Sequence, residues 1–327
     1  MDEQIAAALD DAFPDRDVDA VHPSGPSWND ENRTVGIDFR DGESVYLKMS
    51  NVGDGSRIAR ERAVIDYVGE RGGVPVPTVL ASDSAGAVPY LVTAPVVGES
   101  LLSSWSDANA TERAELARQV GISLANVHAL RFEQHGRIVG GSADGLELET
   151  GPWTDVLVET IAEMRDIGSQ DRFSHHFDAV IEAVEDNREL LDDTPATLLH
   201  GDPARPNCFH GEGRNEGKIG LLDWEIAHVG DPVRDVERTR SLQFDSLRAD
   251  GPEEIVHAFY DGYRDRAGGL PDGFEERRPI YDAVRFLGHT GFYDKYASFR
   301  DEDPEELAAW MDGEMERRIE RITRRDG

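Results

Sequence analysis

Cysteine, long apolar runs and a secretory leader are absent or nearly absent from this chain. The single cysteine among its 327 residues, Cys208, excludes an internal disulfide and is typical of a protein kept in a reducing compartment. No apolar stretch approaches the roughly 20 residues that cross a bilayer, and the first residues lack the pattern of a signal peptide. We therefore expect a cytoplasmic protein in which Cys208 is a small buried hydrophobe rather than a reactive thiol.

Lysine is also scarce. Lys48, Lys218 and Lys295 are the only lysines among 34 basic residues, whereas 66 acidic residues are spread over the whole chain. The formal net charge of −32 predicts a surface that repels nucleic acid and anionic membranes, so we expect neither as a partner. The composition resembles that of proteins from extreme halophiles; an ordinary acidic protein from a mesophile is the alternative. The scarcity of lysine favours the halophile interpretation.

Two segments that each carry a candidate functional aspartate follow one another in the second half of the chain. TLLHGDPARPNCF covers residues 197–209 and IGLLDWEIAHVGDPVRDVER covers residues 219–238, each beginning with an apolar run typical of a strand. Asp202 and Asn207 have the spacing of the Asp and Asn in a kinase catalytic loop. Asp223 follows the second apolar run, as a metal-binding Asp at a strand end would. Either segment alone could be an ordinary turn, but the two in this order favour phosphoryl transfer.

The residue types fit that chemistry. Phosphoryl transfer requires mainly positioning and charge neutralisation from a protein. We expect Asp202 to accept the proton of a substrate hydroxyl. Asn207 and Asp223 offer the hard oxygen ligands that Mg²⁺ accepts, with the phosphates of ATP completing its shell.

The segments resemble the signature of the aminoglycoside phosphotransferase family, which includes choline-kinase-like enzymes and has a protein-kinase-like fold. The matching positions are His200-Gly201-Asp202, Asn207, Asp223-Trp224-Glu225 and Gly230-Asp231-Pro232 with Asp235. The resemblance covers roughly residues 20–310. It implies transfer of the γ-phosphoryl group of Mg-ATP to a hydroxyl of an aminoglycoside, amino alcohol or sugar-like acceptor. It also implies that His200 braces the catalytic loop.

The patterning along the chain predicts a two-lobed α+β fold, with a nucleotide-binding lobe at residues 1–97 and a catalytic, acceptor-binding lobe at 98–327. The elements expected in the small lobe are helices at 2–13 and 57–70 and strands at 33–39, 44–49 and 87–94. Beyond a helix at 111–130 we expect mainly helices, apart from two short strands that carry the acid motifs. The glycine-rich segment 134–151 is interpreted as a mobile loop.

Lys48 is the most informative residue of the small lobe, because it lies in a predicted strand. A kinase-like fold places a lysine on its third strand to contact the α- and β-phosphates, and a glutamate of the next helix holds that lysine. Glu61 is the expected partner, with Glu70 on the same helix as the alternative. A solvent-facing Lys48 is the alternative to the phosphate contact.

A glycine-rich phosphate loop is missing between the first strands, where residues 22–35 offer only Gly25. From the resemblance we carry over Ser27 and Asn32 as phosphate contacts. The backbone from Thr93 to Val96 is expected to hold the adenine.

Other polar residues near the motifs have open or supporting roles. Asp231 and Asp235 flank Pro232 and are expected to cap a helix start. Arg205 could contact the transferred phosphate or pair with a surface acid. The acceptor site is expected among C-terminal helices whose aromatic residues serve equally well as core: Trp153, Tyr260, Tyr263, His289, Phe292 and Tyr293. An acidic cleft would favour a cationic acceptor, but the whole surface is acidic, so the sequence does not identify the acceptor.

Two rival functions use the same residues. A metal-dependent phosphohydrolase would gather Asp202, Asp223 and Asp231 around Mg²⁺, but leaves Lys48 unexplained. A non-catalytic nucleotide-binding protein of kinase-like fold would not need the complete set of Lys48, Asp202, Asn207 and Asp223. Oligomeric state is not predicted.

The charge excess makes a testable prediction about salt. Self-repulsion among the carboxylates should destabilise the folded chain at low ionic strength, and screening at molar salt, where the Debye length falls to about 3 Å, should relieve it. We expect the melting temperature to rise steadily from dilute buffer to ~2 M KCl. A flat or falling melting temperature over that range would rule out the halophile interpretation.

Overall fold

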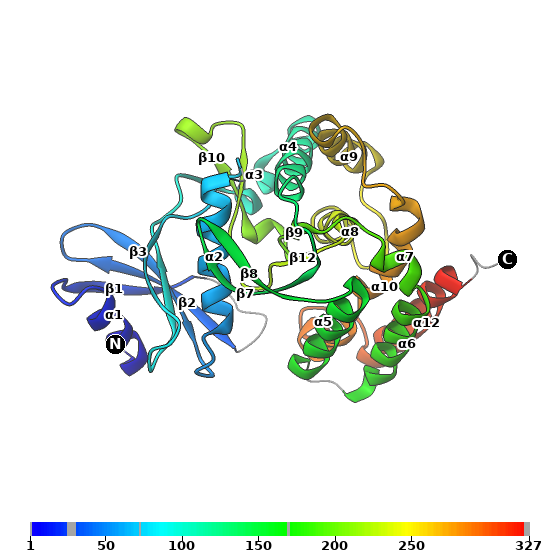
Figure 1. Ribbon diagram of the computed structural model, residues 1–327, viewed down its shortest axis with the longest axis horizontal. Coiled ribbons are helices and arrows are strands. Elements are labelled where there is room, and N and C mark those ends of the chain that lie inside the picture. Colours follow the sequence, from blue (N-terminus) through cyan, green and yellow to red (C-terminus); the bar gives the residue numbers. More distant parts are fainter. Residues whose placement is uncertain (1, 25–30, 72, 169–170, 324–327) are drawn as a thin grey trace.

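The N-terminal sheet lobe and a larger, mainly helical lobe lie side by side in the computed structural model (Figure 1). The structure describes residues 2–24, 31–71, 73–168 and 171–323. The predicted two-lobed α+β architecture is confirmed. No helix among these residues has the length and apolar character needed to cross a bilayer.

The small lobe is built on one antiparallel sheet with the strand order β1-β2-β3-β5-β4. Alternate residues of β2 and β3 are buried, as expected of a sheet with one face on a core. Ile5 and Leu9 of helix α1 pack with Ile37 and Leu47 of the sheet into a small apolar core. The bounds are α1 Glu3–Ala12, β1 Val18–Pro23, β2 Asn32–Phe39, β3 Ser44–Ser50, β4 Val79–Asp83 and β5 Tyr90–Thr93.

Helix α2 (Ser56–Arg71) follows β3 and joins the two lobes. Its buried residues, among them Ile58 and Val68, belong to the main apolar core that continues through the larger lobe. This position fixes the helix that carries Glu61 against both parts of the molecule.

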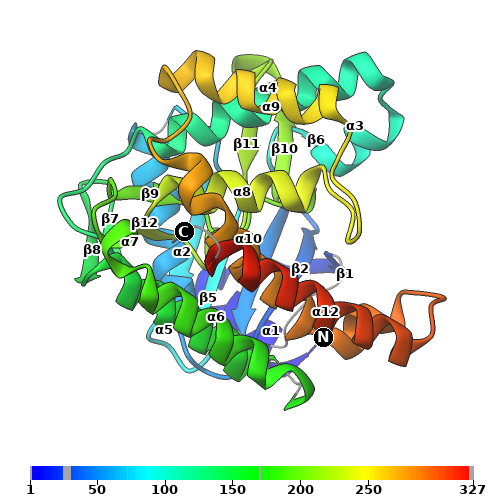
Figure 2. The ribbon, with the colours of Figure 1, turned by 90° about the vertical axis from the view of Figure 1, so that its right-hand side faces the viewer.

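The larger lobe is a set of packed helices (Figure 2). Helices α4 and α9 lie side by side, and α10 packs on α6, α8 and α12. Two glycines permit the close approach of α4 and α9: a Cβ on Gly121 would lie 2.1 Å from the Phe259 carbonyl oxygen, and one on Gly262 would lie 2.0 Å from that of Arg118. The helices are α3 Leu101–Asp107, α4 Ala110–His128, α5 Trp153–Ile167, α6 Ser174–Asp186, α7 Arg188–Asp192, α8 Pro232–Gln243, α9 Glu253–Ala267, α10 Phe274–Thr290, α11 Tyr293–Ser298 and α12 Pro304–Thr323.

The interpretation of residues 134–151 as a mobile loop is wrong. They form the antiparallel hairpin of β7 (Gly136–Ser142) and β8 (Gly145–Thr150). The hairpin is held on α2, because Arg60 Nε donates to the Ile138 carbonyl oxygen at 2.8 Å. Ile138 itself is fully buried in the main core. The high glycine content therefore reflects tight strand contact: a Cβ on Gly136 would lie 2.6 Å from the Glu149 carbonyl oxygen.

Short strands bring the two acid motifs together. The larger lobe contains the sheets β11-β10-β6 and β8-β7-β12-β9, more strands than the two predicted. Their remaining bounds are β6 Gly98–Ser100, β9 Thr197–Leu199, β10 Cys208–Gly211, β11 Ile219–Leu221 and β12 His228–Gly230. Cys208 pairs with Leu221, and the next residues outward, Asn207 and Leu222, are also joined by a backbone hydrogen bond of 2.8 Å. Asn207 of the first motif and Asp223 of the second, which follows Leu222, are therefore brought to the same end of the β10–β11 pair.

Cys208 is fully buried in this arrangement, as predicted. Burial raises the pKa of its thiol to about 12, so the residue is not a thiolate nucleophile at neutral pH.

Candidate active site

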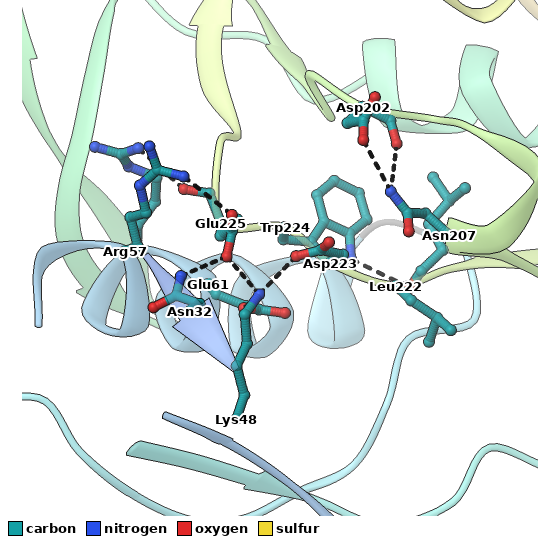
Figure 3. Close-up of polar contacts among 12 residues, drawn as sticks. Asn32, Lys48, Arg57, Glu61, Asp202, Asn207, Leu222, Asp223, Trp224 and Glu225 are labelled. Atoms are coloured by element: carbon teal, nitrogen blue, oxygen red, sulfur yellow. Dashed lines mark hydrogen bonds and ion pairs between the residues drawn. The ribbon is translucent and has the colours of Figure 1, made fainter. Parts of the chain in front are cut away.

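Lys48 lies at the centre of the site, where the two lobes meet (Figure 3). It stands in β3 opposite Thr34 on one side and Leu91 on the other. Its Nζ donates to Glu61 Oε2 and to Asp223 Oδ1, both at 2.6 Å. The Lys48–Glu61 pair joins the sheet to α2, as the sequence predicted, and the contact with Asp223 joins the sheet to the second acid motif. The side chain of Lys48 is only 12% exposed, so it is not a solvent-facing lysine.

A third carboxylate also contacts Lys48, and the sequence analysis did not assign it a role. Glu225 Oε2 lies 2.7 Å from Lys48 Nζ and accepts a 2.6 Å hydrogen bond from Asn32 Nδ2. Glu225 Oε1 accepts from Arg57 at 3.0 Å. In the sequence Glu225 is recognisable as the third residue of the Asp-Trp-Glu motif, but the motif does not indicate that its side chain contacts Lys48.

The three carboxylates outnumber the ammonium group at this point. Burial disfavours the charged form of Lys48, but Asp223, Glu61 and Glu225 hold its pKa well above the usual value. Burial, reinforced by the charges of Asp223 and Glu225, raises the pKa of Glu61 to about 7. Burial also opposes ionisation of Glu225, yet Lys48, Arg57 and Asn32 lower its pKa to about 2. Even with Arg57 counted, two cations face three carboxylates, and an additional cation would relieve the remaining negative charge.

The backbone at Asp223 is held in an unusual conformation. Its φ of 62° is the only positive value at a non-glycine residue in the described chain, a conformation that aspartate tolerates better than most residues. The next residue, Trp224, is fully buried and donates from Nε1 to the Leu221 carbonyl oxygen at 3.2 Å. The Trp224 ring also packs on His200, with centroids 4.4 Å apart. This anchoring turns Asp223 toward Lys48 and leaves its side chain 42% exposed.

His200 braces the catalytic loop, as the resemblance implied. The Asp202 backbone N–H donates to His200 Nδ1 at 3.1 Å, so Nε2 carries the proton and donates to the Leu222 carbonyl oxygen at 2.9 Å. Burial lowers the pKa of His200 and so favours this neutral form.

Asp235 does not cap its own helix, which corrects the sequence prediction. Its carboxylate accepts from the backbone N–H groups of His200, at 2.6 Å, and Gly201, at 3.1 Å. Asp231 performs the predicted capping role, since its Oδ1 accepts from the Val233 backbone at 3.0 Å. The second motif therefore holds the first in place through Asp235.

Asp202 and Asn207 face one another across their loop (Figure 3). Asn207 Nδ2 donates to the Asp202 carbonyl oxygen at 2.9 Å and to Asp202 Oδ2 at 3.1 Å. This leaves the Asn207 amide oxygen as the atom that could meet a metal ion. Arg238 of α8, which the sequence analysis missed, donates to Asp202 Oδ1 at 3.1 Å.

Arg205 forms no ion pair with an acidic residue in the described part of the chain, and its contact with the transferred phosphate stays a prediction. Its Nε donates to the Gln243 carbonyl oxygen at 2.9 Å, and its guanidinium lies 4.6 Å from the centre of the Trp105 ring. It fastens the catalytic loop to the end of α8.

The remaining predicted nucleotide contacts stay predictions. Ser27 lies outside the described residues. Asn32 is buried and reaches Glu225. Thr93 ends β5, and Val96 follows it in the segment that leads to β6. Among the aromatic candidates for the acceptor site, four are buried in the core: Trp153, Tyr260, Tyr263 and Tyr293.

Solved structures with this arrangement of lobes have very different sequences. A candidate fructosamine-3-kinase from Thermobifida fusca is 19% identical with a TM-score of 0.63, and the match covers 97% of this chain and 98% of that one. The aminoglycoside phosphotransferase APH(4)-Ia is 17% identical with a TM-score of 0.62, over 98% of both chains. A macrolide 2′-phosphotransferase from Brachybacterium faecium is 19% identical with a TM-score of 0.54, over 93% of this chain and 97% of that one. At these identities the likeness establishes the fold, which is protein-kinase-like.

Fold and site together define a small-molecule kinase, an enzyme that transfers a phosphoryl group to a hydroxyl. A search of curated protein sequences finds no significant match. The model of the phosphotransferase enzyme family matches residues 26–287, and the chain belongs to that family.

The three-carboxylate contact predicts the effect of changing Lys48. Lys48→Ala leaves Glu61, Asp223 and Glu225 without their shared cation, so it should cost about 3–5 kcal/mol of stability and nearly abolish phosphoryl transfer. Lys48→Arg keeps the charge, but the wide planar guanidinium of arginine does not fit among three carboxylates as the compact ammonium of lysine does. Activity should therefore fall in this variant as well. Thermal melting and steady-state turnover of both variants measure these effects.

The control is Lys218→Ala, because Lys218 is exposed and the lysine that contacts the three carboxylates is Lys48. It should match the parent protein in melting temperature and turnover. If Lys48→Arg were as active as the parent, the anchor of the phosphate site would have to be a residue other than Lys48.

Proposed function

We propose that this enzyme transfers the γ-phosphoryl group of Mg-ATP to a hydroxyl group of a small molecule. The observation that carries the proposal is the junction of Lys48, Glu61 and Asp223 beside the hydrogen-bonded pair of Asp202 and Asn207. Residues 1–97 would bind the nucleotide and residues 98–327 would supply the base and the acceptor site.

Each residue has a defined part in this reaction. Lys48, oriented by Glu61, neutralises phosphate charge on the nucleotide. The Asp202 carboxylate takes the proton of the acceptor hydroxyl while that oxygen bonds to the γ-phosphorus. The bond between the γ-phosphorus and the bridging oxygen breaks, and ADP leaves. Arg238 and Asn207 hold the two carboxylate oxygens of Asp202 in place for this step.

The donor set fits a divalent cation. Oxygen atoms of Glu61, Asp223 and Glu225 all lie within 4.8 Å of one another, and their negative charge exceeds that of Lys48. Asp223 is the exposed member, and the Asn207 amide oxygen is not used in holding Asp202. These two residues would hold Mg²⁺, which would neutralise charge on the phosphates.

The phosphohydrolase alternative loses one of its three ligands. Asp231 is fully buried and accepts from Arg277 Nε and from the Tyr281 hydroxyl, each at 2.6 Å. It is thus committed to the core and does not face Asp202 and Asp223 as a metal ligand. Product analysis with ATP at high KCl tests the proposal: a phosphorylated acceptor supports it, while free phosphate alone or unchanged ATP contradicts it.

Asp202→Asn should lower turnover by about 10²–10⁴-fold, because the amide cannot accept the hydroxyl proton. Nucleotide affinity should change little, since Asp202 is not placed on the phosphates. Single-turnover kinetics with a reactive acceptor and equilibrium binding of ATP separate the two effects. Asp261→Asn, at an exposed position of α9, is the matched control. A variant that kept more than a few per cent of the rate would remove Asp202 from the role of base.

Asp223→Asn should raise the Mg²⁺ concentration needed for activity by at least about tenfold, because a charged metal ligand is lost. Asparagine is preferable to alanine here because it tolerates the positive φ of this position. Turnover and nucleotide binding measured across a Mg²⁺ titration provide the readout. An unchanged metal requirement would count against Asp223 as a ligand.

A further inference from the structure

A cavity of about 430 Å³ lies in the larger lobe, between α8, α10 and α12 and the segment at residues 245–250. Six arginines and five carboxylates line it. The chain as a whole has a formal net charge of −32, so the excess of basic over acidic residues in this cavity is opposite to the charge balance of the rest of the molecule. The sequence alone did not indicate it, because the arginines come from three helices and a loop.

Arg285 of α10 is the unusual member of this lining. Its Nε is buried without a hydrogen-bond partner, and within the described residues no carboxylate forms an ion pair with it. The other cavity arginines that are deeply placed have acidic partners: Arg240 lies 3.4 Å from Asp245, and Arg318 lies 3.0 Å from Glu314. Burying a guanidinium N–H without a hydrogen-bond acceptor destabilises the folded protein. Arg285 is therefore suited to bind a negatively charged group of a ligand.

The cavity carboxylates do not compensate Arg285. Asp282 and Glu314 are both engaged by Arg318, and Asp245 and Asp250 are paired with Arg240. Burial raises the pKa of Glu237 to about 8, so this residue is largely uncharged at neutral pH.

Arg285 lies on α10, which packs on α8, the helix that carries Arg238. Burial lowers the pKa of Arg285 to about 10, and the charge of Arg238 adds to the effect while that of Asp202 opposes it. Arg238 itself contacts Asp202 Oδ1 at 3.1 Å. Burial also holds the pKa of the cavity residue His289 well below its usual value, and Arg285 is the largest of the charges that add to this effect. A group bound at Arg285 would therefore be near the base.

We propose that the acceptor carries a phosphate or carboxylate group, that this group binds Arg285 in the α8–α10–α12 cavity, and that the acceptor hydroxyl is thereby presented to Asp202. The planar fork of arginine matches both anions through paired hydrogen bonds. A cationic aminosugar would meet like charge at the same place. This assignment of substrate class rests on the proposed phosphotransferase function.

A binding experiment tests the cavity without requiring turnover. Trp310 lines the cavity, so its fluorescence reports occupancy, and Trp310→Phe identifies its share of the signal. The probes are inorganic phosphate and acetate, titrated at constant ionic strength set with KCl. We expect saturable binding by the parent protein, weakened about 30-fold or more in Arg285→Gln and partly restored in Arg285→Lys. Arg264→Gln, at an exposed position of α9, should bind as the parent does. Equal binding by the parent and Arg285→Gln, or no saturable binding of either anion, would overturn the proposal.

Turnover with matched acceptors then distinguishes phosphate from carboxylate. Glucose, glucosamine, gluconate and glucose 6-phosphate form one set, and glycerol, glycerate and glycerol 3-phosphate form another. We expect kcat/KM to favour one anionic member of a set, and Arg285→Gln to reduce that preference over the neutral member by about 30-fold or more. General damage to the fold would lower both rates and leave their ratio unchanged.

The two proposals fail in different ways. A preference for the neutral or cationic compounds that Arg285→Gln does not alter would overturn the anionic acceptor and leave the kinase function standing. Anion binding that depends on Arg285, together with ATP that is never consumed with any acceptor, would retain the anion site and contradict the proposed function.

Discussion

The ammonium group of Lys48 is the contact on which the two-lobed arrangement depends. It comes from the N-terminal sheet and meets carboxylates of α2 and of the turn after β11. Three negative groups around one buried positive charge are stable only while that charge stays in place. The same contact joins the sheet to α2 and to the turn after β11 and forms the expected phosphate site, so positioning and chemistry are combined in one residue.

The catalytic loop is held by a second, separate set of contacts. Asp235 binds the backbone at His200 and Gly201, and His200 in turn joins that loop to the carbonyl group of Leu222. Trp224 fills the space beneath the imidazole. Neutral His200, buried Asp235 and the Trp224 ring each have their polar groups engaged, which keeps the partly exposed carboxylates of Asp202 and Asp223 in fixed positions. The exposed groups are those that the proposed reaction uses, and the buried ones orient them.

Charge is distributed unevenly in this molecule. Acidic residues dominate the whole chain, and carboxylates also predominate around Lys48. The cavity between α8, α10 and α12 differs because arginines of these helices converge there. A divalent cation with a nucleotide suits the first region, and an anionic acceptor suits the second.

The sequence by itself determined the features that depend on neighbouring residues. The spacing of Asp202 and Asn207, the strand that carries Lys48, the helix that carries Glu61 and the order of the lobes were all predictable, because periodicity and short loops are local properties. Contacts between distant segments were not. Glu225 meets Asn32 across 193 positions of sequence, the glycine-rich segment 134–151 became a hairpin because α2 supports it, and Asp235 serves a loop rather than its own helix. The arginine cavity likewise exists only because three helices pack together. Arginines that are far apart in the sequence face one cavity only when tertiary packing brings their helices side by side.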